Sequence, residues 1–557
     1  MKKIICLLCF FIRVTLSFSQ QFTHADTLRG SNGAGRNWWD VLKYDIILKP
    51  NIDNKTIKGT AKILFKTNSN GNKTMQIDLQ EPLIIDKIIF ENVNVRFIKT
   101  ETNTWSVYLK NIEPKMYMDH IDGGKGWTTK QQSITIYYHG KPHVAIKPPW
   151  DGGIIWTKDK NDNPWISIAC QGLGASFWYP CKDYQGDEPD NGAGLTITVP
   201  DTLMAVANGR LLSTKKNKDG TTSYSWAVVN PINNYCIIPY IGKYVNFNEV
   251  YKGEKGILNM NYWALDYNIE KAKKQFTDAP KMMKAFEYWF GPYPFYEDGY
   301  KLVEAPYVGM ENQSDIAYGN NFENGYASSG DLSGTGWGLQ WDFIIVHESA
   351  HEWFGNNITA KDIADMWIHE SFANYAETLF TEYYYGKKAA SEYVIGIRKK
   401  ILNDSPIIGM YGVNKTGSPD MYYKGGNMLH TIRQIINDDE KFRNLLRGLN
   451  KTFYHQTVTT KQIEAFINKT SAIDFSKVFD QYLRTTMIPT LEYKIKNGIL
   501  FYRWQNVVKG FNMPLKIMQS KNKFSFIYPS EYFKQIKFNA DTLQTDDNFY
   551  IITNKVN

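Results

Sequence analysis

The hydrophobic pattern of this chain changes twice along its length. No other feature of the sequence restricts the possible folds as strongly. Between residues 43 and 244, apolar and polar residues alternate with a period of two, interrupted by turn signals. In "KGTAKILFKT", for example, Ala61, Ile63 and Phe65 fall on one face. Many short strands without helical segments predict a β-sandwich or a large open sheet.

The pattern becomes helical after about residue 250. The segment "IEKAKKQFTDAPKMMKAFEYWF" has helical spacing and is ended by Gly291 and Pro292. Helical patterns dominate to about Arg484, and the glycine-rich "ASSGDLSGTGWG" at 327–338 reads either as a flexible linker or as a loop beside a site.

Alternation returns from Pro489 in "TLEYKIKNGILFYRW", "KFSFIYP" and "NFYIIT". Because 557 residues are too many for one ordinary core, we expect a multidomain α+β protein. The expected parts are a leader (1–19), an N-terminal β-domain (20–245), an α-rich domain (246–486) and a small C-terminal β-domain (487–557).

The first residues, "MKKIICLLCFFIRVTLSFSQQ", are typical of a signal peptide. Two lysines precede an apolar run, and Ser17 and Ser19 supply small residues at the cleavage positions. The run is too short, and too broken by Arg13, to span a bilayer, and no other unbroken apolar segment of about 18 residues follows. We therefore expect an exported protein, periplasmic or secreted, with no transmembrane segment in the mature chain.

The composition excludes some function classes. Hydrophobic content of 43% and charged content of 22% are typical of a soluble globular protein. The formal net charge is +8, but the densest basic run, "TKKNKDG" at 214–220, ends in a turn signal and is typical of a solvated hairpin. We expect no nucleic-acid partner.

Once the leader is removed, three cysteines remain, namely Cys170, Cys181 and Cys236. An odd number permits at most one disulfide and leaves one free thiol. No two of them have the close spacing of a zinc ribbon or a redox motif.

The segment "IIVHESAHEWFGN" contains the motif HExxH. On a helix, His347 and His351 lie four residues apart on one face, and Glu348 points toward the same side. Two buried histidines with ordinary hydrogen bonds would give the same spacing. A catalytic zinc site requires three protein ligands and an open position for water, so a third ligand has to come from elsewhere.

A second helical segment supplies it. "IADMWIHESFANYAETLFTEYYYG", ended by Gly386, carries Glu370 with 18 residues between it and His351, which is the spacing of gluzincins. This leaves room for a loop and a returning helix, so we expect Glu370 as the third ligand of one Zn²⁺ per chain.

Other groups on the second helix could orient the ligand imidazoles. Asn374 and Glu377 follow Glu370 by one and two turns and are candidates for this role, although either could be an ordinary helix residue. His369 precedes the ligand, and we expect it to point elsewhere because neighbouring helical positions diverge.

With these residues in place, the chain resembles the zinc aminopeptidases of the aminopeptidase N and leukotriene hydrolase family, from about residue 44 to about residue 517. "VGMEN" at 308–312 resembles the family's GxMEN signature, with Val308 where glycine is usual, and "FGPYPF" resembles the segment before it. "WIHESF" stands where the family has "WLNEGF", "YYKGG" at 422–426 resembles YxKGA, and "CQGLGASFWYPCKD" resembles a substrate-binding segment.

The resemblance implies a saddle-like N-terminal β-domain and a thermolysin-like catalytic domain. It also implies that the substrates are peptides with a free N-terminus and that particular residues bind them. Glu311 and Gln171 would hold the substrate ammonium through charge-assisted hydrogen bonds. The backbone N–H of Gly309 or Met310 would hold a substrate carbonyl. Val308 lies near the expected first side-chain pocket, so we expect Val308→Gly to change the preferred residue.

The resemblance also assigns the chemistry. Glu348 would be the general base that takes a proton from the zinc-activated water and delivers it to the leaving amine. Tyr422 would donate a hydrogen bond to the oxyanion. These roles predict a zinc metallo-aminopeptidase.

Other readings remain open. Only residues 516–557 follow Leu515, too few for the large C-terminal helical domain of many relatives, so the site is either more open or covered by a partner subunit. An endopeptidase of the thermolysin sort or an epoxide hydrolase could use the same scaffold, and a substrate with a blocked N-terminus would distinguish them. A non-enzymatic binding scaffold should have lost a zinc ligand, the base or the tyrosine, and none is lost.

Overall fold

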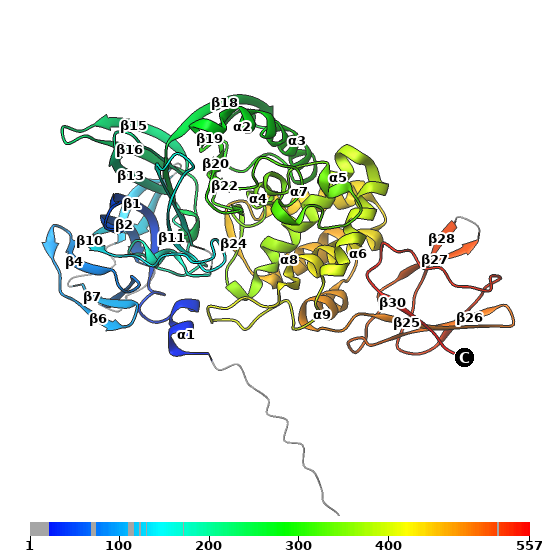
Figure 1. Ribbon diagram of the computed structural model, residues 1–557. Coiled ribbons are helices and arrows are strands. Elements are labelled where there is room, and N and C mark those ends of the chain that lie inside the picture. The colour runs from blue at the N-terminus through cyan, green and yellow to red at the C-terminus, as the bar shows by residue number, and fades with distance from the viewer. Residues whose placement is uncertain are drawn as a thin grey trace, which may run out of the picture.

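A computed structural model describes residues 22–67, 74–109, 116–121, 124–129, 131–170, 172–520 and 523–557. In Figure 1 the chain runs from a β-rich unit through a helical unit to a small group of C-terminal strands. This arrangement confirms the expected multidomain α+β fold. The predicted leader (1–19) and Gln171 lie outside the described residues.

The N-terminal unit is built around a mixed eight-stranded sheet. Its strands, in spatial order, are β15 (Arg210–Lys216), β16 (Thr221–Val228), β13 (Ala193–Pro200), β1 (Trp39–Asn51), β2 (Thr56–Thr67), β10 (Gln132–Gly140), β4 (Ile84–Phe90) and β5 (Val93–Asn94). The predicted alternation is confirmed in β2, where Ala61 is fully buried opposite Ile46 of β1 and Ile136 of β10. The basic run at 214–220 forms the end of β15 and the turn to β16, which confirms the predicted hairpin.

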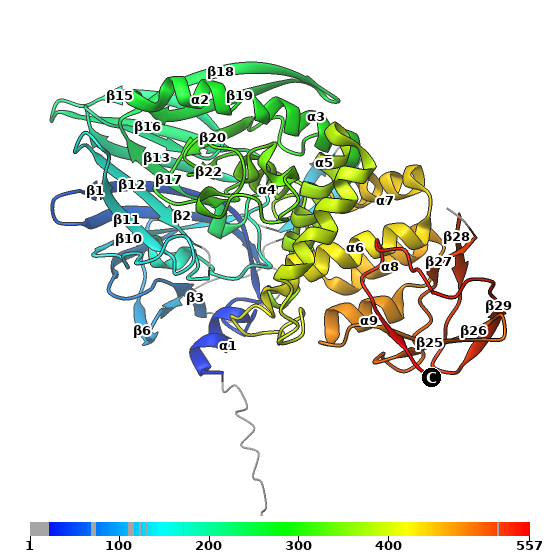
Figure 2. The same cartoon turned by 45° about the vertical axis from the view of Figure 1, so that its right-hand side comes forward.

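This unit also contains smaller sheets. They consist of β11 (Gly153–Lys158), β12 (Pro164–Ala169), β17 (Pro239–Gly242) and β14 (Met204–Ala207); of β3 (Thr74–Asp78), β7 (Thr104–Tyr108) and β6 (Phe97–Glu101); and of β8 (Met116–Ile121) and β9 (Gly124–Thr129). A short helix, α1 (His24–Gly30), precedes β1 and lies between the β-rich and helical units in both ribbon views (Figures 1 and 2).

A five-stranded sheet joins the two large units. Its order is β18 (Tyr244–Gly253), β19 (Gly256–Leu265), β20 (Tyr300–Glu304), β22 (Ile316–Tyr318) and β21 (Gly309–Met310). Because neighbouring residues of a strand face opposite sides, Ile316 packs in the helical core while Ala317 packs in the N-terminal core. The sheet is therefore the common wall of both units, and its edge strand β21 contains the first two residues of the GMEN segment.

The helical unit contains α2 (Ile269–Gln275), α3 (Asp278–Phe290), α4 (Phe343–Ala350), α5 (Trp367–Gly396), α6 (Tyr423–Ile436), α7 (Asp439–Thr452), α8 (Thr460–Ser471) and α9 (Ser476–Arg484). Two short strands, β23 (Ile358–Ala360) and β24 (Gln456–Val458), pair between them. Gly291 caps α3 with φ 95°, which confirms the predicted end of that helix. Gly386 has φ 87° and breaks the helical backbone as predicted, but a helix continues beyond it to Gly396.

The C-terminal strands form a sheet of β29 (Lys534–Lys537), β26 (Ile499–Gln505), β25 (Thr490–Lys496) and β30 (Ile552–Lys555), beside the hairpin β27 (Leu515–Ser520) and β28 (Lys523–Ile527). Their buried residues, such as Trp504 and Leu500, belong to the same core cluster as the helices. The C-terminal part is therefore packed onto the helical unit.

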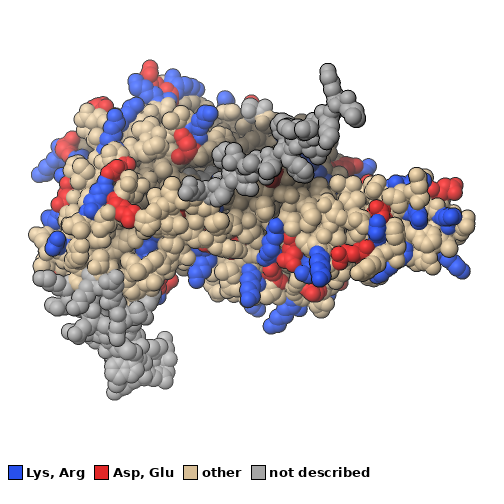
Figure 3. All heavy atoms as spheres, turned by 90° about the horizontal axis from the view of Figure 1, so that it is seen from below, with Lys and Arg blue, Asp and Glu red and all other residues tan. Residues whose placement is uncertain are grey.

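Cys170, Cys181 and Cys236 are buried free thiols, so the disulfide that the sequence permitted is not formed among them. Among the described residues, no helix combines the length and the apolar character needed to cross a membrane. On the face shown in Figure 3, basic and acidic side chains are interspersed.

Candidate metal centre and active-site cavity

Helix α4 carries the HExxH motif and is held at its first turn by a buried carboxylate. Asp342 caps the helix by accepting hydrogen bonds from the N–H groups of Ile344 and Ile345 at 3.0 and 3.2 Å. The same carboxylate accepts a 2.7 Å hydrogen bond from the hydroxyl of Tyr318 in β22. Asp342 therefore fixes α4 against the five-stranded sheet that carries the GMEN segment.

The two histidines of the motif and Glu370 converge, as the sequence predicted. His347 lies in α4, His351 caps its C-terminus, and Glu370 lies in the first turn of α5. Glu370 Oε2 lies 3.7 Å from His347 Nε2 and 3.5 Å from His351 Nε2. All three side chains are buried, and one potential ligand atom from each lies within 4.8 Å of the others.

The hydrogen bonds around these residues fit a bound cation. His347 Nδ1 lies 2.8 Å from Glu377 Oε1 and His351 Nδ1 lies 3.0 Å from the Phe354 carbonyl oxygen, and both partners can only accept. Each Nδ1 therefore carries the proton, which leaves a lone pair on each Nε2 facing Glu370 Oε2. That buried oxygen has no hydrogen-bond partner among the described residues. Three acceptors without a donor between them match the ligand set of a divalent metal such as zinc.

Glu377 and Asn374 lie behind His347, as the sequence predicted. Asn374 Nδ2 donates to both oxygens of Glu377 at 3.1 and 3.2 Å, and the Tyr393 hydroxyl donates to Oε2 at 2.6 Å. These donors orient the Glu377 carboxylate so that its Oε1 accepts the hydrogen bond from Nδ1 of His347. This arrangement fixes both the tautomer and the orientation of the ring.

His369 points away from the other histidines, as predicted. Its Nε2 accepts a 2.8 Å hydrogen bond from the N–H of Ala360 in β23. Burial lowers the pKa of His369 to about 3, so it is a neutral structural residue.

The side chain of Glu348, on α4, faces the edge strand β21. Burial raises its pKa to about 8; a cation nearby would act in the opposite direction. A Cβ atom built on Gly309 would lie 2.7 Å from Glu348 Oε1 and 3.0 Å from atoms of Ile344. Glycine at position 309 therefore lets strand and base approach closely.

The register of β21 separates the two predicted backbone donors. Gly309 lies opposite Tyr318 of β22, and the N–H of Gly319 donates to the carbonyl of Val308 at 2.9 Å. In an antiparallel ladder this makes Gly309 a non-hydrogen-bonded position, so its N–H and carbonyl face the outer edge. The backbone groups of Met310 face β22 instead.

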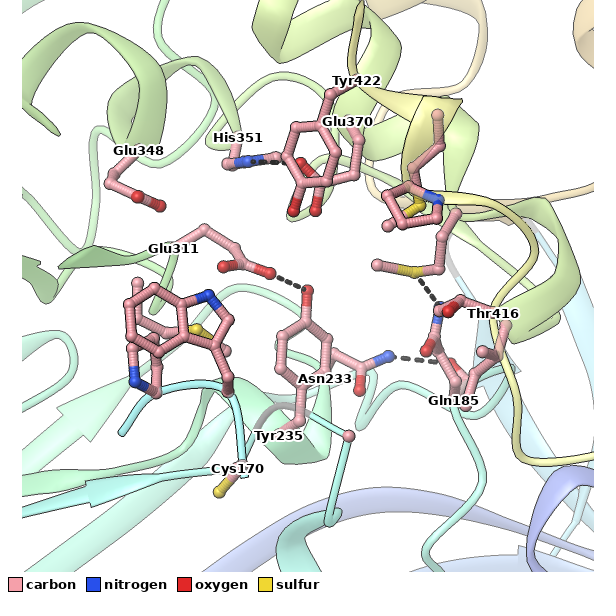
Figure 4. A pocket seen from close by; sticks show the side chains of 18 of the residues that line it. Cys170, Gln185, Asn233, Tyr235, Glu311, Glu348, His351, Glu370, Thr416 and Tyr422 are labelled. Atoms are coloured by element: carbon pink, nitrogen blue, oxygen red, sulfur yellow. Dashed lines mark hydrogen bonds and ion pairs between the residues drawn. The ribbon is translucent and has the colours of Figure 1, made fainter. Parts of the chain in front are cut away.

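Glu311, which follows in the GMEN segment, is buried beside the candidate metal ligands. It can share a cation site with Glu348 and His351, since potential ligand atoms of these three lie within 4.8 Å of one another. The hydroxyl of Tyr235 donates to Glu311 Oε1 at 3.2 Å (Figure 4). Burial raises the pKa of Glu311. Tyr235 was not among the predicted site residues, because its segment "PINNYCIIPYIGKY" contains no motif with a recognisable chemical role.

Tyr422 is held at the junction between a short turn and α6. Its ring is stacked on that of His347, with centroids 6.0 Å apart, and lies beside Glu370 in Figure 4. The preceding residue, Met421, is tied to α5 by a 2.6 Å hydrogen bond from Ser371 Oγ to its carbonyl. Burial raises the pKa of Tyr422 well above its ordinary value, so its hydroxyl remains protonated as a donor.

These residues share one cavity of about 690 Å³. His347, His351, Glu370, Glu348, Glu311, Gly309, Met310 and Tyr422 all line it, as does Val308. Of the predicted site residues, Gln171 alone falls outside the described residues, although its neighbours Cys170 and Gly172 line the same cavity. The cavity has the size of a site for a small ligand or a short peptide.

Comparison with known proteins gives two family matches. Residues 41–236 match the family model described as the Peptidase M1 N-terminal domain, and residues 275–482 match the Peptidase family M1 domain. Together the two matches cover more than two thirds of the chain.

Similar proteins of known function are distant. The chain is 23% identical over 346 residues to leukotriene A-4 hydrolase of Xenopus laevis, covering 58% of this chain and 53% of that protein. It is 23% identical over 297 residues to endoplasmic reticulum aminopeptidase 1 of Mus musculus, covering 51% of this chain and 31% of that protein. The matched part thus spans about half of the first relative and less of the second.

Solved structures agree with the fold. An M1 zinc metallopeptidase from Deinococcus radiodurans superposes with a TM-score of 0.66 at 17% sequence identity, covering 82% of this chain and 96% of that one. A mutant of it bound to the substrate Tyr-Ser-Ala superposes with a TM-score of 0.65, covering 83% and 98%. At this identity the likeness shows the fold alone.

Proposed function

The chain belongs to peptidase family M1, and from this premise we propose that it is a zinc-dependent aminopeptidase that releases N-terminal residues from peptides. One observation supports this most: the buried triad of His347, His351 and Glu370 lies next to a second carboxylate, Glu311, in one cavity. A metal triad alone would fit many hydrolases. The added carboxylate gives the cavity a place for a cationic group of the substrate.

Glu311 is the proposed anchor of the substrate ammonium. A peptide α-amino group has a pKa of about 7.7–8.0 and is largely protonated at neutral pH. Glu311 Oε1 accepts from Tyr235, which leaves its other oxygen for the ammonium. We propose Gln171 as the second partner, on the strength of the sequence motif alone.

The metal would be one Zn²⁺ per chain. Bound by the triad, it would polarise the scissile carbonyl and lower the pKa of water to about 7. Glu348, whose carboxylate lies against Gly309, would accept a proton from the attacking water and deliver it to the leaving nitrogen.

Two hydrogen-bond donors are proposed to bind the oxyanion and the peptide backbone of the substrate. The Tyr422 hydroxyl is a protonated donor beside Glu370, which suits stabilisation of the oxyanion. The N–H of Gly309, turned to the outer edge of β21, suits hydrogen bonding to an extended peptide laid along that edge.

The test compares a leucyl or alanyl fluorogenic amide with its N-acetylated twin, with and without a chelator. An aminopeptidase cleaves the free-amine substrate only, and the chelator abolishes cleavage until zinc is restored. Cleavage of both substrates would instead identify an endopeptidase. Turnover of an epoxide but of neither amide would point to an epoxide hydrolase. Cleavage of neither amide, and of no member of a wider panel, would leave a binding scaffold.

We also propose that the protein is exported to the periplasm or secreted. Support comes from the leader-like residues 1–19 of the sequence. Expression of the full chain in a bacterial host, followed by fractionation and N-terminal sequencing, tests it: a chain starting near Gln20 outside the cytoplasm is expected, and an uncleaved cytoplasmic chain would contradict it.

A further inference from the structure

We infer that Leu332 of the glycine-rich loop at 327–338, together with Tyr326, Phe343 and Tyr423, forms an apolar pocket that selects a large apolar side chain on the second residue of the peptide. This inference rests on the proposed aminopeptidase function, because it uses Glu348 as the group that protonates the leaving nitrogen. It goes further by naming the class of side chain that the leaving residue carries.

Four side chains define this apolar pocket: Tyr326, Leu332, Phe343 and Tyr423. All four line the cavity that contains the metal triad. The rings of Tyr326 and Phe343 meet edge to face with centroids 4.9 Å apart. Phe343 in turn stacks on His347 with centroids 5.1 Å apart and ring planes 13° apart. A continuous run of apolar surface therefore leads from the loop to the first metal ligand.

The position of Glu348 tells which part of a peptide reaches this pocket. Glu348 delivers its proton to the nitrogen that leaves, and that nitrogen belongs to the second residue. The side chain of the second residue therefore lies on the Glu348 side of the metal. Phe343 is one helical turn before His347 on the same helix as Glu348, and Tyr326 packs edge to face against Phe343. Gln185 and Thr416 lie at the opposite end of the view in Figure 4.

The loop that supplies Leu332 is preformed. Its turn is closed by hydrogen bonds between the backbones of Tyr326 and Gly330 at 2.8 and 3.0 Å. Asp331 accepts from the N–H of Gly336 at 2.6 Å, and Lys399 of the helical unit donates to the Ser333 carbonyl at 3.0 Å. Because the loop is already ordered, peptide binding costs little conformational entropy at this position. More of the contact free energy is then available to discriminate between side chains by shape.

The charges around the pocket disfavour acidic side chains. None of the four wall residues is charged, and two carboxylates, Glu348 and Glu377, line the same cavity. An aspartate or glutamate here would lose its hydration without gaining a partner and would face like charge. A phenylalanine or leucine would bury its surface against rings and aliphatic carbon.

The experiment measures kcat/KM for four dipeptide amides that share N-terminal alanine, namely Ala-Phe-NH₂, Ala-Leu-NH₂, Ala-Gly-NH₂ and Ala-Asp-NH₂. The constant first residue removes effects of the first side-chain pocket, and the amide removes the terminal carboxylate. We expect the phenylalanine and leucine substrates to exceed the glycine substrate at least about tenfold, with the aspartate substrate lowest.

Variants locate the effect. Leu332→Ala and Tyr326→Ala should each reduce the ratio between the phenylalanine and glycine substrates by about threefold or more, whereas Tyr326→Phe should preserve it. Leu402→Ala and Tyr528→Ala, at residues each 62% exposed outside the cavity, are matched controls that should leave the ratio unchanged. The zinc content and melting temperature of each variant show whether it is still folded, so that a changed substrate preference can be distinguished from unfolding.

The outcomes distinguish the two proposals. Equal hydrolysis of all four amides, or preference for aspartate, overturns the apolar pocket and leaves the aminopeptidase proposal standing. A preference for phenylalanine that survives both alanine variants in folded, zinc-loaded protein also overturns it. Hydrolysis of none of the amides overturns the proposed function, and the pocket assignment falls with it.

Discussion

The carboxylate of Glu377 lies 2.8 Å from Nδ1 of His347, and three hydrogen bonds donated by Asn374 and Tyr393 hold it in that position. This pair connects α5 to α4 behind the metal triad, so the basicity of one ligand is set by a residue two turns beyond another ligand. A negative partner on Nδ1 makes Nε2 a stronger ligand.

Glu377→Gln is therefore expected to weaken zinc binding about 10–100-fold while leaving the fold intact. The amide keeps an oxygen toward the ring but removes the charge that strengthens the imidazole. Competition with a chromophoric chelator measures the affinity, and Glu440→Gln, an exposed change on α7, is the control. An affinity equal to that of the unaltered protein would show that the pair does not tune the ligand.

Glu348→Gln should separate metal binding from chemistry. Glu348 is not part of the triad, so the variant should retain one zinc per chain, while turnover falls by about 10²–10⁴ because the proton acceptor is lost. His351→Ala should lose both zinc and turnover. Metal analysis beside kcat on a leucyl amide checks this, and near-normal turnover of Glu348→Gln would refute the proposed role of the base.

Gly309→Ala tests the close approach of β21 to α4. The added methyl group would lie 2.7 Å from Glu348 Oε1 and 3.0 Å from Ile344, so the base has to move or the strand has to retreat. We expect zinc content to be preserved and kcat/KM to fall by about tenfold or more, since small misplacements of catalytic groups are costly. Gly33→Ala, where the nearest atom would be 3.9 Å away, serves as the benign glycine change.

Tyr422→Phe removes one hydroxyl next to Glu370 and leaves the ring stacked on His347. A donor to the oxyanion acts in the transition state, so kcat should fall by about 10²–10³ while KM changes little. Steady-state kinetics on a free-amine substrate distinguishes this from a binding defect. If KM rises and kcat holds, Tyr422 binds the ground state and the oxyanion role is wrong.

The layout of the molecule could be predicted from periodicity. Alternation in β2, the end of α3 at Gly291 and the C-terminal strands all followed from local pattern, because each element buries one face or ends at a residue with special backbone freedom. The convergence of His347, His351 and Glu370 also followed, since spacing along two helices limits where the third ligand can lie.

Other features needed the folded structure. The strands β20, β21 and β22 lie inside a part of the sequence with mainly helical patterns, and they are too short for alternation to show. Tyr235 reaches Glu311 from the N-terminal unit across 76 positions of sequence, which local pattern does not reveal. The backbone direction of Gly309 depends on the ladder register with β22, which only the paired strands define.

Position 426 carries the last prediction. The related motif YxKGA has alanine where this chain has Gly426, and the structure gives the reason: a Cβ atom there would lie 2.4 Å from Asn374 Oδ1. Asn374 is the residue that donates to Glu377 behind His347. Gly426→Ala should therefore lower the free energy of unfolding by about 1–3 kcal/mol through overpacking between α5 and α6.

A double-mutant cycle isolates this contact. Asn374→Ala removes the obstructing amide, so adding Gly426→Ala to it should cost little, and chemical denaturation of the four proteins should give a coupling energy of about 1 kcal/mol or more. Zinc affinity should fall in both single variants, because each one disturbs the donor to Glu377. Additive stabilities would mean that the two helices adjust freely, and glycine at position 426 would then have no role in supporting the metal site.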